Sequence, residues 1–245
     1  MSFSGQIPFE NPDKWQRRYL PHYDAAGIYQ VLTYRLRDSL PREVVARLRE
    51  THGDNDQARR KAAETYLDAG YGSCVLRKPE VAKMVVDCWR HFHGQRYRVI
   101  AYVVMPNHVH LLILTFEGWS IESLVHSWKT WTGRRILEIE GHWPRRSLGA
   151  PPSVVGRVAF PPRSEQSHHG GWGSQVFSPF EIDDHEDNPV WQREVWDRFI
   201  RDEKHYHAAI AYIHDNPKKA GLVENAEDWP WSSKSHPFPR EERET

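Results

Sequence analysis

Apolar residues recur in two different periods along this chain, and the two periods predict strands and helices in alternation. Runs rich in β-branched and aromatic residues predict three strands, over 28–36, 97–105 and 109–114. Apolar residues spaced three and four apart predict helices after Pro41, over 55–69, from Pro79, and from Ser120 to Ile139. A short strand within 190–200 and a helix from Asp202 to Asn216 follow, and Pro217 is expected to end that helix. This order predicts an α+β fold of ferredoxin-like type, an antiparallel sheet with helices packed on one face.

The same pattern predicts one core that is interrupted once. Residues 27–140 and 190–235 carry the periodic elements, and we expect them to form the first and second parts of that core. The remaining segments lack the pattern: a polar arm over 1–26, a Pro/Gly-rich insertion or flexible loop over 141–189, and a polar tail over 236–245.

The amino-acid composition excludes fewer classes of function than the pattern of apolar and polar residues does. The formal net charge of the 245 residues is zero, so a nucleic-acid partner has to be held by local basic patches. The two cysteines, Cys74 and Cys88, match no metal-binding spacing. The chain starts without the pattern of a signal peptide, and no apolar run approaches the ~18 residues of a membrane span. We therefore expect a cytoplasmic protein without a membrane partner.

The most informative stretch is His108-Val109-His110, which lies at the start of a predicted strand. Residues two apart on a strand point to the same face, so the two imidazoles can converge on one divalent cation. Val109 and the apolar residues that alternate with it belong to the opposite, core-facing side. Two hydrogen-bonded core histidines are the other interpretation of this pair.

The last predicted helix presents two faces. Its buried stripe is expected to contain Tyr206, Ala209, Ile210 and Ile213. Tyr212 lies off that stripe and shares a face with Asn216, four residues on, which offers an oxygen as a third ligand for the cation. His205 is on the Tyr212 side as well, and its role stays open.

Several motifs together resemble one family. The segment 106–112 (PNHVHLL) resembles the HUH motif (His, hydrophobic, His) of single-tyrosine transposases, and 212–223 (YIHDNPKKAGLV) resembles their tyrosine helix. The segments 17–22, 35–41 and 227–233 resemble the branch called REP-associated tyrosine transposases. The resemblance covers roughly 15–140 and 190–235.

The resemblance implies a ferredoxin-like nuclease domain and an activity. His108, His110 and Asn216 would bind a divalent cation, Mg²⁺ or Mn²⁺, and Tyr212 would be the nucleophile. The implied enzyme is a single-stranded DNA endonuclease and strand transferase, which acts at hairpins of repetitive extragenic palindromes through a covalent 5′-phosphotyrosine. Its implied use is DNA transposition, by a monomer or a homodimer. Many relatives in the wider superfamily have Gln where this chain has Asn216.

Charged residues around the predicted core are candidate DNA contacts. We name as candidates Lys129, Arg134, Arg135, Arg193, Arg198, Arg201, Lys218 and Lys219. Each can equally be a solvated surface charge. Two other functions remain open at this point: a hairpin-binding regulator that does not cut, and a metal-dependent hydrolase that uses water and keeps its activity in Tyr212→Phe.

Overall fold

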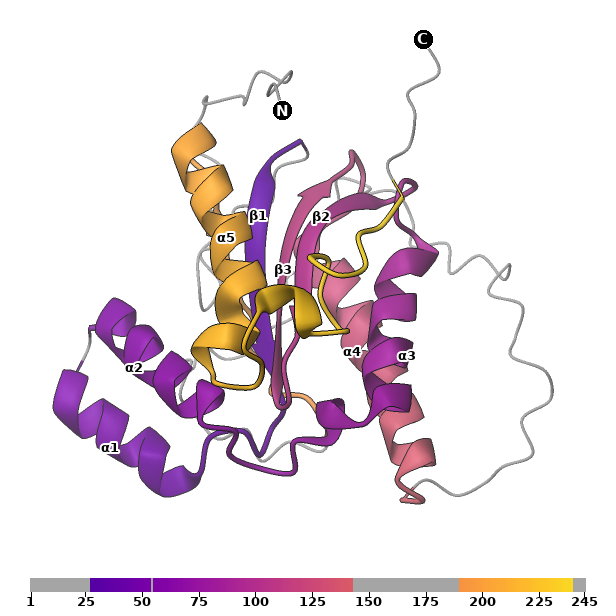
Figure 1. Cartoon of the computed structure of the whole chain (residues 1–245). Coiled ribbons are helices and arrows are strands. Elements are labelled where there is room, and N and C mark those ends of the chain that lie inside the picture. The colour runs from indigo at the N-terminus through magenta and orange to yellow at the C-terminus, as the bar shows by residue number, and fades with distance from the viewer. Residues whose placement is uncertain (1–26, 54, 143–189, 240–245) are drawn as a thin grey trace, which may run out of the picture.

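A computed structural model describes residues 27–53, 55–142 and 190–239. The predicted arm 1–26, nearly all of 141–189 and the end of the tail lie outside the described residues. The described elements are β1 Tyr29–Arg35, α1 Arg42–His52, α2 Asp56–Asp68, α3 Pro79–His91, β2 Tyr97–Val104, β3 His108–Thr115, α4 Ile121–Ile139, β4 Trp196–Phe199 and α5 Glu203–Lys219 (Figure 1). Two short 3₁₀ helices, Val75–Arg77 and Ala226–Asp228, complete the set. No helix in these ranges is long and apolar enough to cross a membrane.

The four strands form one antiparallel sheet in the order β2-β3-β1-β4. This strand order and the βαββαβ succession confirm the predicted α+β, ferredoxin-like class. The register of β1 against β3 sets Thr33 opposite His110 and Arg35 opposite His108. The central strand β3 is buried along almost its whole length, so what it carries is held rigidly.

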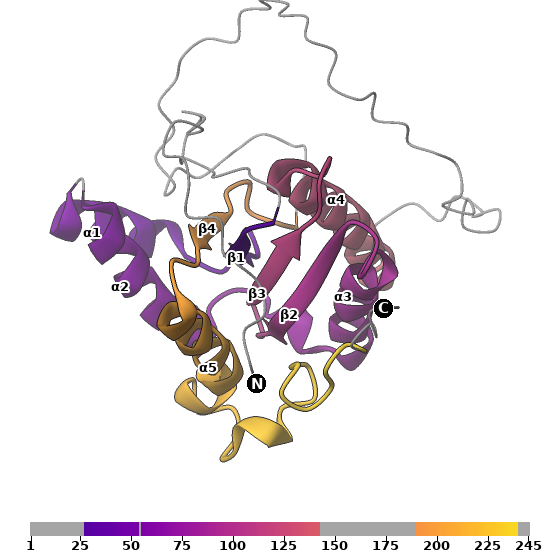
Figure 2. The ribbon, with the colours of Figure 1, turned by 90° about the horizontal axis from the view of Figure 1, so that it is seen from above.

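Helices cover both faces of the sheet, rather than the single face that the order of elements predicted (Figure 2). The helices α3 and α4 pack on one face, against Val109, Leu111 and Ile113 of β3. The helix α5 packs on the other face, where Ala209 and Ile213 meet Leu112. The difference arises because α5 follows the last strand and is free to cross to the open face. That crossing places α5 on the side toward which His108 and His110 point.

The helices α1 and α2 follow β1 in the chain and precede α3, and they form an antiparallel pair. The pair packs on a separate, smaller core. Its buried members are Leu40, Val45, Leu48, Ala63, Leu67 and Trp196. Trp196 belongs to β4, so the pair is attached to the β4 edge of the sheet. The C-terminal end of α2 is thereby brought close to the histidine strand.

The helix α5 continues past Asn216 to Lys219, and the prediction that Pro217 ends it is wrong. Proline lacks an N–H and so cannot bond to the carbonyl one turn earlier, but near a helix end this loses only one bond. The carbonyl of Asn216 still accepts from Ala220 N–H at 2.9 Å, and that of Pro217 accepts from Leu222 N–H at 2.9 Å. Asn216 is therefore held in regular helix, one turn after Tyr212.

The segment after α5 covers the β2 edge of the sheet. Val104 N–H donates to the carbonyl of Trp231 at 2.8 Å, and the indole N–H of Trp229 donates to the carbonyl of Val104 at 2.9 Å. An isolated antiparallel bridge joins Val103 to Ser232. These contacts give Trp229 and Trp231 a packing role, and they occupy backbone groups of an edge strand that would otherwise be open to pairing.

Candidate active site

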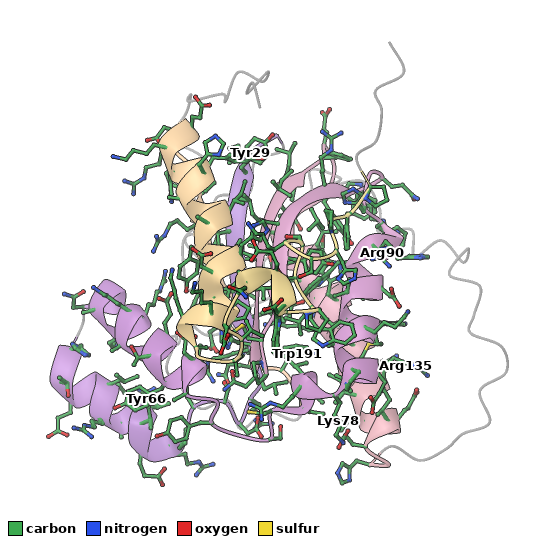
Figure 3. All side chains as sticks on the ribbon, viewed as in Figure 1. Tyr29, Tyr66, Lys78, Arg90, Arg135 and Trp191 are labelled. Carbon is green, nitrogen blue, oxygen red and sulfur yellow. The ribbon has the colours of Figure 1, made fainter. Side chains whose placement is uncertain are left out.

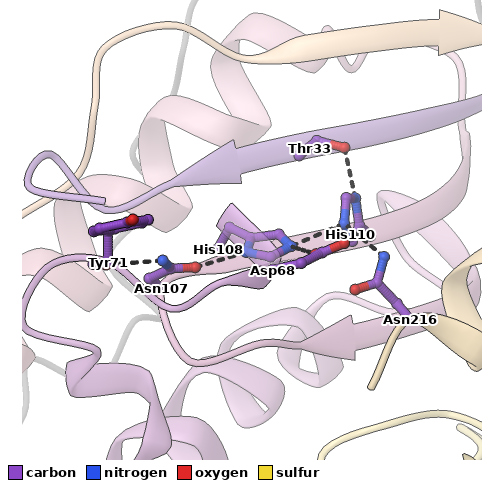
Figure 4. Close-up of polar contacts among 7 residues, drawn as sticks. All are labelled: Thr33, Asp68, Tyr71, Asn107, His108, His110 and Asn216. Atoms are coloured by element: carbon purple, nitrogen blue, oxygen red, sulfur yellow. Dashed lines mark hydrogen bonds and ion pairs between the residues drawn. The ribbon is translucent and has the colours of Figure 1, made fainter. Parts of the chain in front are cut away.

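His108 and His110 are both buried and converge as the two-residue spacing predicts (Figure 4). Their Nε2 atoms are 3.1 Å apart, and the rings meet edge to face with centroids 4.8 Å apart. Val109 between them points to the opposite face, into the core with α3 and α4. The pair therefore aims two ring nitrogens at one point on the α5 side of the sheet.

The neighbour Asn107 fixes which nitrogen of His108 carries the proton. The Asn107 amide nitrogen donates to the carbonyl of Tyr71 at 2.8 Å, and a carbonyl can only accept. The Asn107 amide oxygen is thus the atom that faces His108 Nδ1, at 2.8 Å, and it accepts from an Nδ1–H. The lone pair of His108 is left on Nε2, which is the nitrogen that a metal-binding histidine needs.

Thr33 plays the matching part for His110 from the neighbouring strand. Its hydroxyl lies 2.7 Å from His110 Nδ1 and can accept an Nδ1–H in the same way. Burial lowers the pKa of His108 well below its usual value and that of His110 to about 3, so both rings are neutral. When His110 donates its Nδ1–H to Thr33, the two rings direct lone pairs at each other across 3.1 Å, an arrangement that a cation between them would stabilise.

Asn216 completes the donor set from α5. Its amide nitrogen lies 3.3 Å from His110 Nε2, and its buried amide oxygen has no hydrogen-bond partner among the described residues. A half-turn of the amide group exchanges the two atoms and brings the oxygen to the histidine pair. In the described ranges no three His, Cys, Asp or Glu residues form a metal site, so a cation on the two histidines would need a ligand of another kind, such as this amide. Two imidazoles and one amide oxygen fit a divalent ion such as Mn²⁺ or Mg²⁺.

Tyr212 lies beside this donor set. Its ring meets the ring of His110 edge to face, with centroids 5.3 Å apart, and the Lys219 ammonium is 5.1 Å from its centroid. Burial raises the pKa of the Tyr212 phenol well above 10, and the negative charges of Glu64 and Asp68 raise it further. The phenol is therefore protonated at neutral pH, and it has to lose that proton to act as a nucleophile.

Two carboxylates of α2 belong to the site and were not predicted. Asp68 Oδ1 lies 3.9 Å from His108 Nε2, and the negative charge of Glu64 acts on the Tyr212 phenol and raises its pKa. Burial raises the pKa of both carboxyl groups. Their only sequence signal is an acidic pair spaced four apart, which places both on one face of α2.

Lys129 is wrong as a candidate DNA contact. It is only 6% exposed, and its ammonium donates to the carbonyls of Gln192, Arg193 and Glu194 at 2.7, 2.9 and 3.1 Å. An ammonium enclosed by three carbonyls cannot reach a phosphate. Lys129 instead fastens the chain where it enters β4 to the helix α4.

The other basic candidates divide by face. Arg134 and Arg135 lie on α4, which packs on the face of the sheet opposite to the histidines. Arg135, labelled in Figure 3, is paired with Glu138. Exposed side chains on the β4 and α5 side are Arg193, Arg198, Arg201, Lys218 and Lys219. The charges of Arg198 and Lys219 both act on Glu64, which places these two beside the site. His205 Nδ1 accepts from the backbone N–H of Arg201 at 3.3 Å, a local contact at the start of α5.

Several known proteins are similar to parts of this chain. The family model described as transposase IS200 like matches residues 77–149, which include both histidines. The chain is 48% identical over 44 residues to a putative REP-associated tyrosine transposase of Haemophilus influenzae, and 41% identical over 44 residues to the REP-associated tyrosine transposase of Escherichia coli K12. These matches span 18% of this chain and only 25% and 27% of the two relatives. A solved structure of a REP-associated tyrosine transposase bound to a REP hairpin has a TM-score of 0.43 and 16% identity, over 90% of this chain and 87% of that one. The family model and the two relatives agree with the resemblance that the motifs predicted, over the parts of the chain that they cover.

Proposed function

We propose that this chain, a relative of the REP-associated tyrosine transposases, is a metal-dependent endonuclease and strand transferase that acts on single-stranded DNA at hairpins. The observation that carries the proposal is the meeting of three donors and one nucleophile. Two neutral histidines, the unpartnered oxygen of Asn216 and the phenol of Tyr212 come together from β3 and α5.

The donor set decides what the bound ion would do. A divalent cation held by His108, His110 and Asn216 would supply positive charge to the scissile phosphate. Two imidazoles are soft ligands for Mg²⁺, which favours Mn²⁺. Asn107 and Thr33 keep both Nδ1 atoms engaged, so that both Nε2 lone pairs remain available.

Tyr212 makes exchange of the phosphoester, rather than hydrolysis, the expected reaction. The phenol oxygen attacks phosphorus, forms a 5′-phosphotyrosine and releases a 3′-OH. One phosphoester bond replaces another, so the 3′-OH of another DNA end can reverse the step and join the strands. This assignment is supported by the edge-to-face contact of the Tyr212 ring with His110, one of the three proposed metal ligands.

Local charge offers a place for the DNA in spite of the zero net charge. Arg198 and Lys219 are exposed beside the site, and such charges bind a phosphate backbone by releasing counterions. The hairpin as substrate rests on the names of the two curated relatives, both REP-associated.

The test is a denaturing gel of labelled single-stranded hairpin oligonucleotides, taken from the genomic flanks of the coding region. They are incubated with the protein and Mn²⁺, Mg²⁺ or a chelator. A metal-dependent covalent adduct is expected from the unmodified chain and not from Tyr212→Phe. Tyr206→Phe is the matched control, because Tyr206 lies on the same helix but packs on Tyr29 in the core.

Each alternative function predicts a different gel. A hydrolase that activates water would still cut in Tyr212→Phe and would give no adduct. A hairpin-binding regulator would retard the oligonucleotide in a native gel without cutting it under any metal condition. Either result would overturn the proposal.

A further inference from the structure

We propose that Tyr71 is a substrate-positioning residue, whose ring stacks on the unpaired base just 5′ of the scissile phosphate. This base belongs to the nucleotide that carries the released 3′-OH. The contact rests on the proposed function, and it gives a role to the loop between α2 and the 3₁₀ helix Val75–Arg77. No sequence motif points to Tyr71, because a single tyrosine between two glycines has no periodic pattern.

Tyr71 exposes an aromatic ring to water. It is 42% exposed, and the only other large apolar side chains with such exposure among the described residues are Trp131 and Ile139. Both belong to α4, which packs on the face of the sheet opposite to the histidines. The ring of Tyr66 lies 6.1 Å from that of Tyr71, between centroids, and is tilted by 45°, so the two rings are not stacked. An accessible aromatic face is a surface on which a base of single-stranded DNA can stack.

The loop that carries Tyr71 is held by hydrogen bonds to two other segments of the chain. The backbone N–H of Ser73 donates to Asp38 Oδ2 at 2.6 Å. The carbonyl of Tyr71 itself accepts from the side-chain amide of Asn107 at 2.8 Å. The ring therefore stands on a backbone that is already fixed without DNA, which reduces the conformational entropy that stacking would cost.

Tyr71 and Tyr212 lie on opposite sides of the histidine pair. Asn107 donates to the carbonyl of Tyr71, and its own amide oxygen accepts from His108, so the loop is attached on the His108 side. The ring of Tyr212 contacts His110 instead. Figure 4 shows this order as a row that runs from Tyr71 past Asn107 and His108 to His110.

The in-line geometry of the proposed reaction then selects the base. The attacking and the leaving oxygen lie on opposite sides of phosphorus in such a displacement. With Tyr212 on one side of a phosphate held at the histidines, the departing 3′ oxygen and its nucleotide lie on the other side, toward Tyr71. A stacked base there would also keep the 3′-OH in place after the cut. The 3′-OH can then attack the phosphotyrosine, form the phosphodiester again and release the phenol.

The surface beyond the ring has room for the next nucleotide. Gly72 and Ser73 line a cavity of about 640 Å³, whose wall also contains Leu36. The backbone N–H of Leu36 donates to the carbonyl of Asn107 at 2.8 Å, so the cavity borders the residue that holds the Tyr71 loop. A strand that passes Tyr71 can therefore continue along a hollow of the protein.

The experiment is a double-mutant cycle between protein and DNA, in the Tyr212→Phe background with Mn²⁺ so that no adduct forms. The cut is first mapped with the unmodified chain, from the length of the fragment that ends in 3′-OH. Fluorescence anisotropy then gives the affinity for the intact hairpin oligonucleotide and for one with an abasic site just 5′ of the cut. We expect Tyr71→Ala to weaken binding of the intact oligonucleotide by about 10- to 100-fold, the effect of losing one base–aromatic stack. Binding of the abasic oligonucleotide should change by less than about threefold, because its partner for the ring is already missing.

Matched variants separate stacking from a structural role. Tyr71→Phe keeps the ring and should bind like the parent protein, and Trp131→Ala removes a similarly exposed ring from α4 and should have no effect. A 2-aminopurine base just 5′ of the cut should lose fluorescence on binding to the parent protein and to Tyr71→Phe, and less on binding to Tyr71→Ala. The carbonyl that holds Asn107 remains in Tyr71→Ala, so the Mn²⁺ concentration for half-maximal adduct should stay the same when Tyr212 is present. Tyr71→Leu replaces Tyr71→Ala in the cycle if the alanine variant unfolds.

The possible outcomes distinguish the contact from the proposed function. An equal loss on the intact and the abasic oligonucleotide, or no loss on either, overturns the stacking role and leaves the proposed function intact. A loss that disappears only when the abasic site lies 3′ of the cut overturns the assignment of the base. Absence of an adduct from the unmodified chain overturns the proposed function, and the contact of Tyr71 with it.

Discussion

The buried ammonium of Lys129 should make the stability of this protein depend on pH in a direction that can be tested. Burial is the main cause that lowers the pKa of Lys129 to about 7, from an ordinary value of 10.5. The unfolded chain therefore binds more protons than the folded chain between pH 7 and about 10, and the free energy of unfolding rises with pH across that window. One pKa unit corresponds to ~1.4 kcal/mol, so the rise from pH 7 to pH 9 is about 2 kcal/mol, since the folded group is half protonated at the start.

The perturbation is Lys129→Met, which fills similar space without the charge. Urea unfolding followed by tryptophan fluorescence at pH 7, 8 and 9 gives the free energy of each protein. The quantity to compare is the difference between the two pH profiles, because Cys88, whose pKa burial raises to about 12, contributes with the opposite sign near pH 9 in both proteins. We expect the unmodified chain to gain about 2 kcal/mol relative to Lys129→Met over this range. The exposed Lys204→Met is the control. Parallel profiles for all three proteins would refute the argument and mean that the carbonyl cage fully compensates the desolvation of the ammonium.

Three shorter predictions address the site and its support. Thr33→Val removes the partner of His110 Nδ1, and the Mn²⁺ concentration for half-maximal adduct should rise by about 10- to 100-fold, measured by metal titration on the gel. Lys219→Gln removes one charge beside Tyr212, and the slope of log affinity against log salt should become shallower by about 0.7 in fluorescence anisotropy with a single-stranded oligonucleotide; an unchanged slope would exclude a phosphate contact there. Gly72→Ala should destabilise the protein by about 1–3 kcal/mol in thermal unfolding, because φ at Gly72 is +88° and a Cβ would lie 2.6 Å from the carbonyl oxygen of Asp38. Stability equal to that of the unmodified chain would show that the loop relaxes freely.

The fold could be predicted from the sequence wherever the spacing of apolar residues and the order of the elements indicated the same structure. The strands around the histidines and the helix capped by Ser120, whose side chain accepts from Ser123 N–H at 3.1 Å, lie within about a residue of their predicted bounds. The convergence of His108 and His110 follows from the two-residue period of a strand alone. Which face of the sheet α5 covers is a different matter, since its amphipathic stripe fits either face and only the route of the connection decides.

The prediction for Lys129 failed because it relied on the charge of the side chain rather than on its position in the helix. It lies four residues after Val125 in α4, at the edge of the buried stripe, yet its charge suggested a solvated face. The three carbonyls that surround it come from 192–194, more than sixty residues later in the chain. A buried lysine is stable only with such partners, and the local sequence pattern cannot predict hydrogen-bond partners that lie so far away in the chain.

The carboxylates of α2 are the part of the site that the sequence did not predict, and their charge bears on the cation that we propose there. The α1–α2 pair is attached through a core of its own, so nothing in the period of the sheet indicates where α2 ends. Its placement brings Glu64 and Asp68, two negative groups, to the point where a phosphodiester has to approach Tyr212. Negative charges at close range in a partly buried site repel each other strongly, and the neutral histidines do nothing to offset this. A phosphate can therefore be held here only with compensating positive charge, which Lys219 and Arg198 supply at the rim and a divalent ion on His108, His110 and Asn216 would supply at the centre.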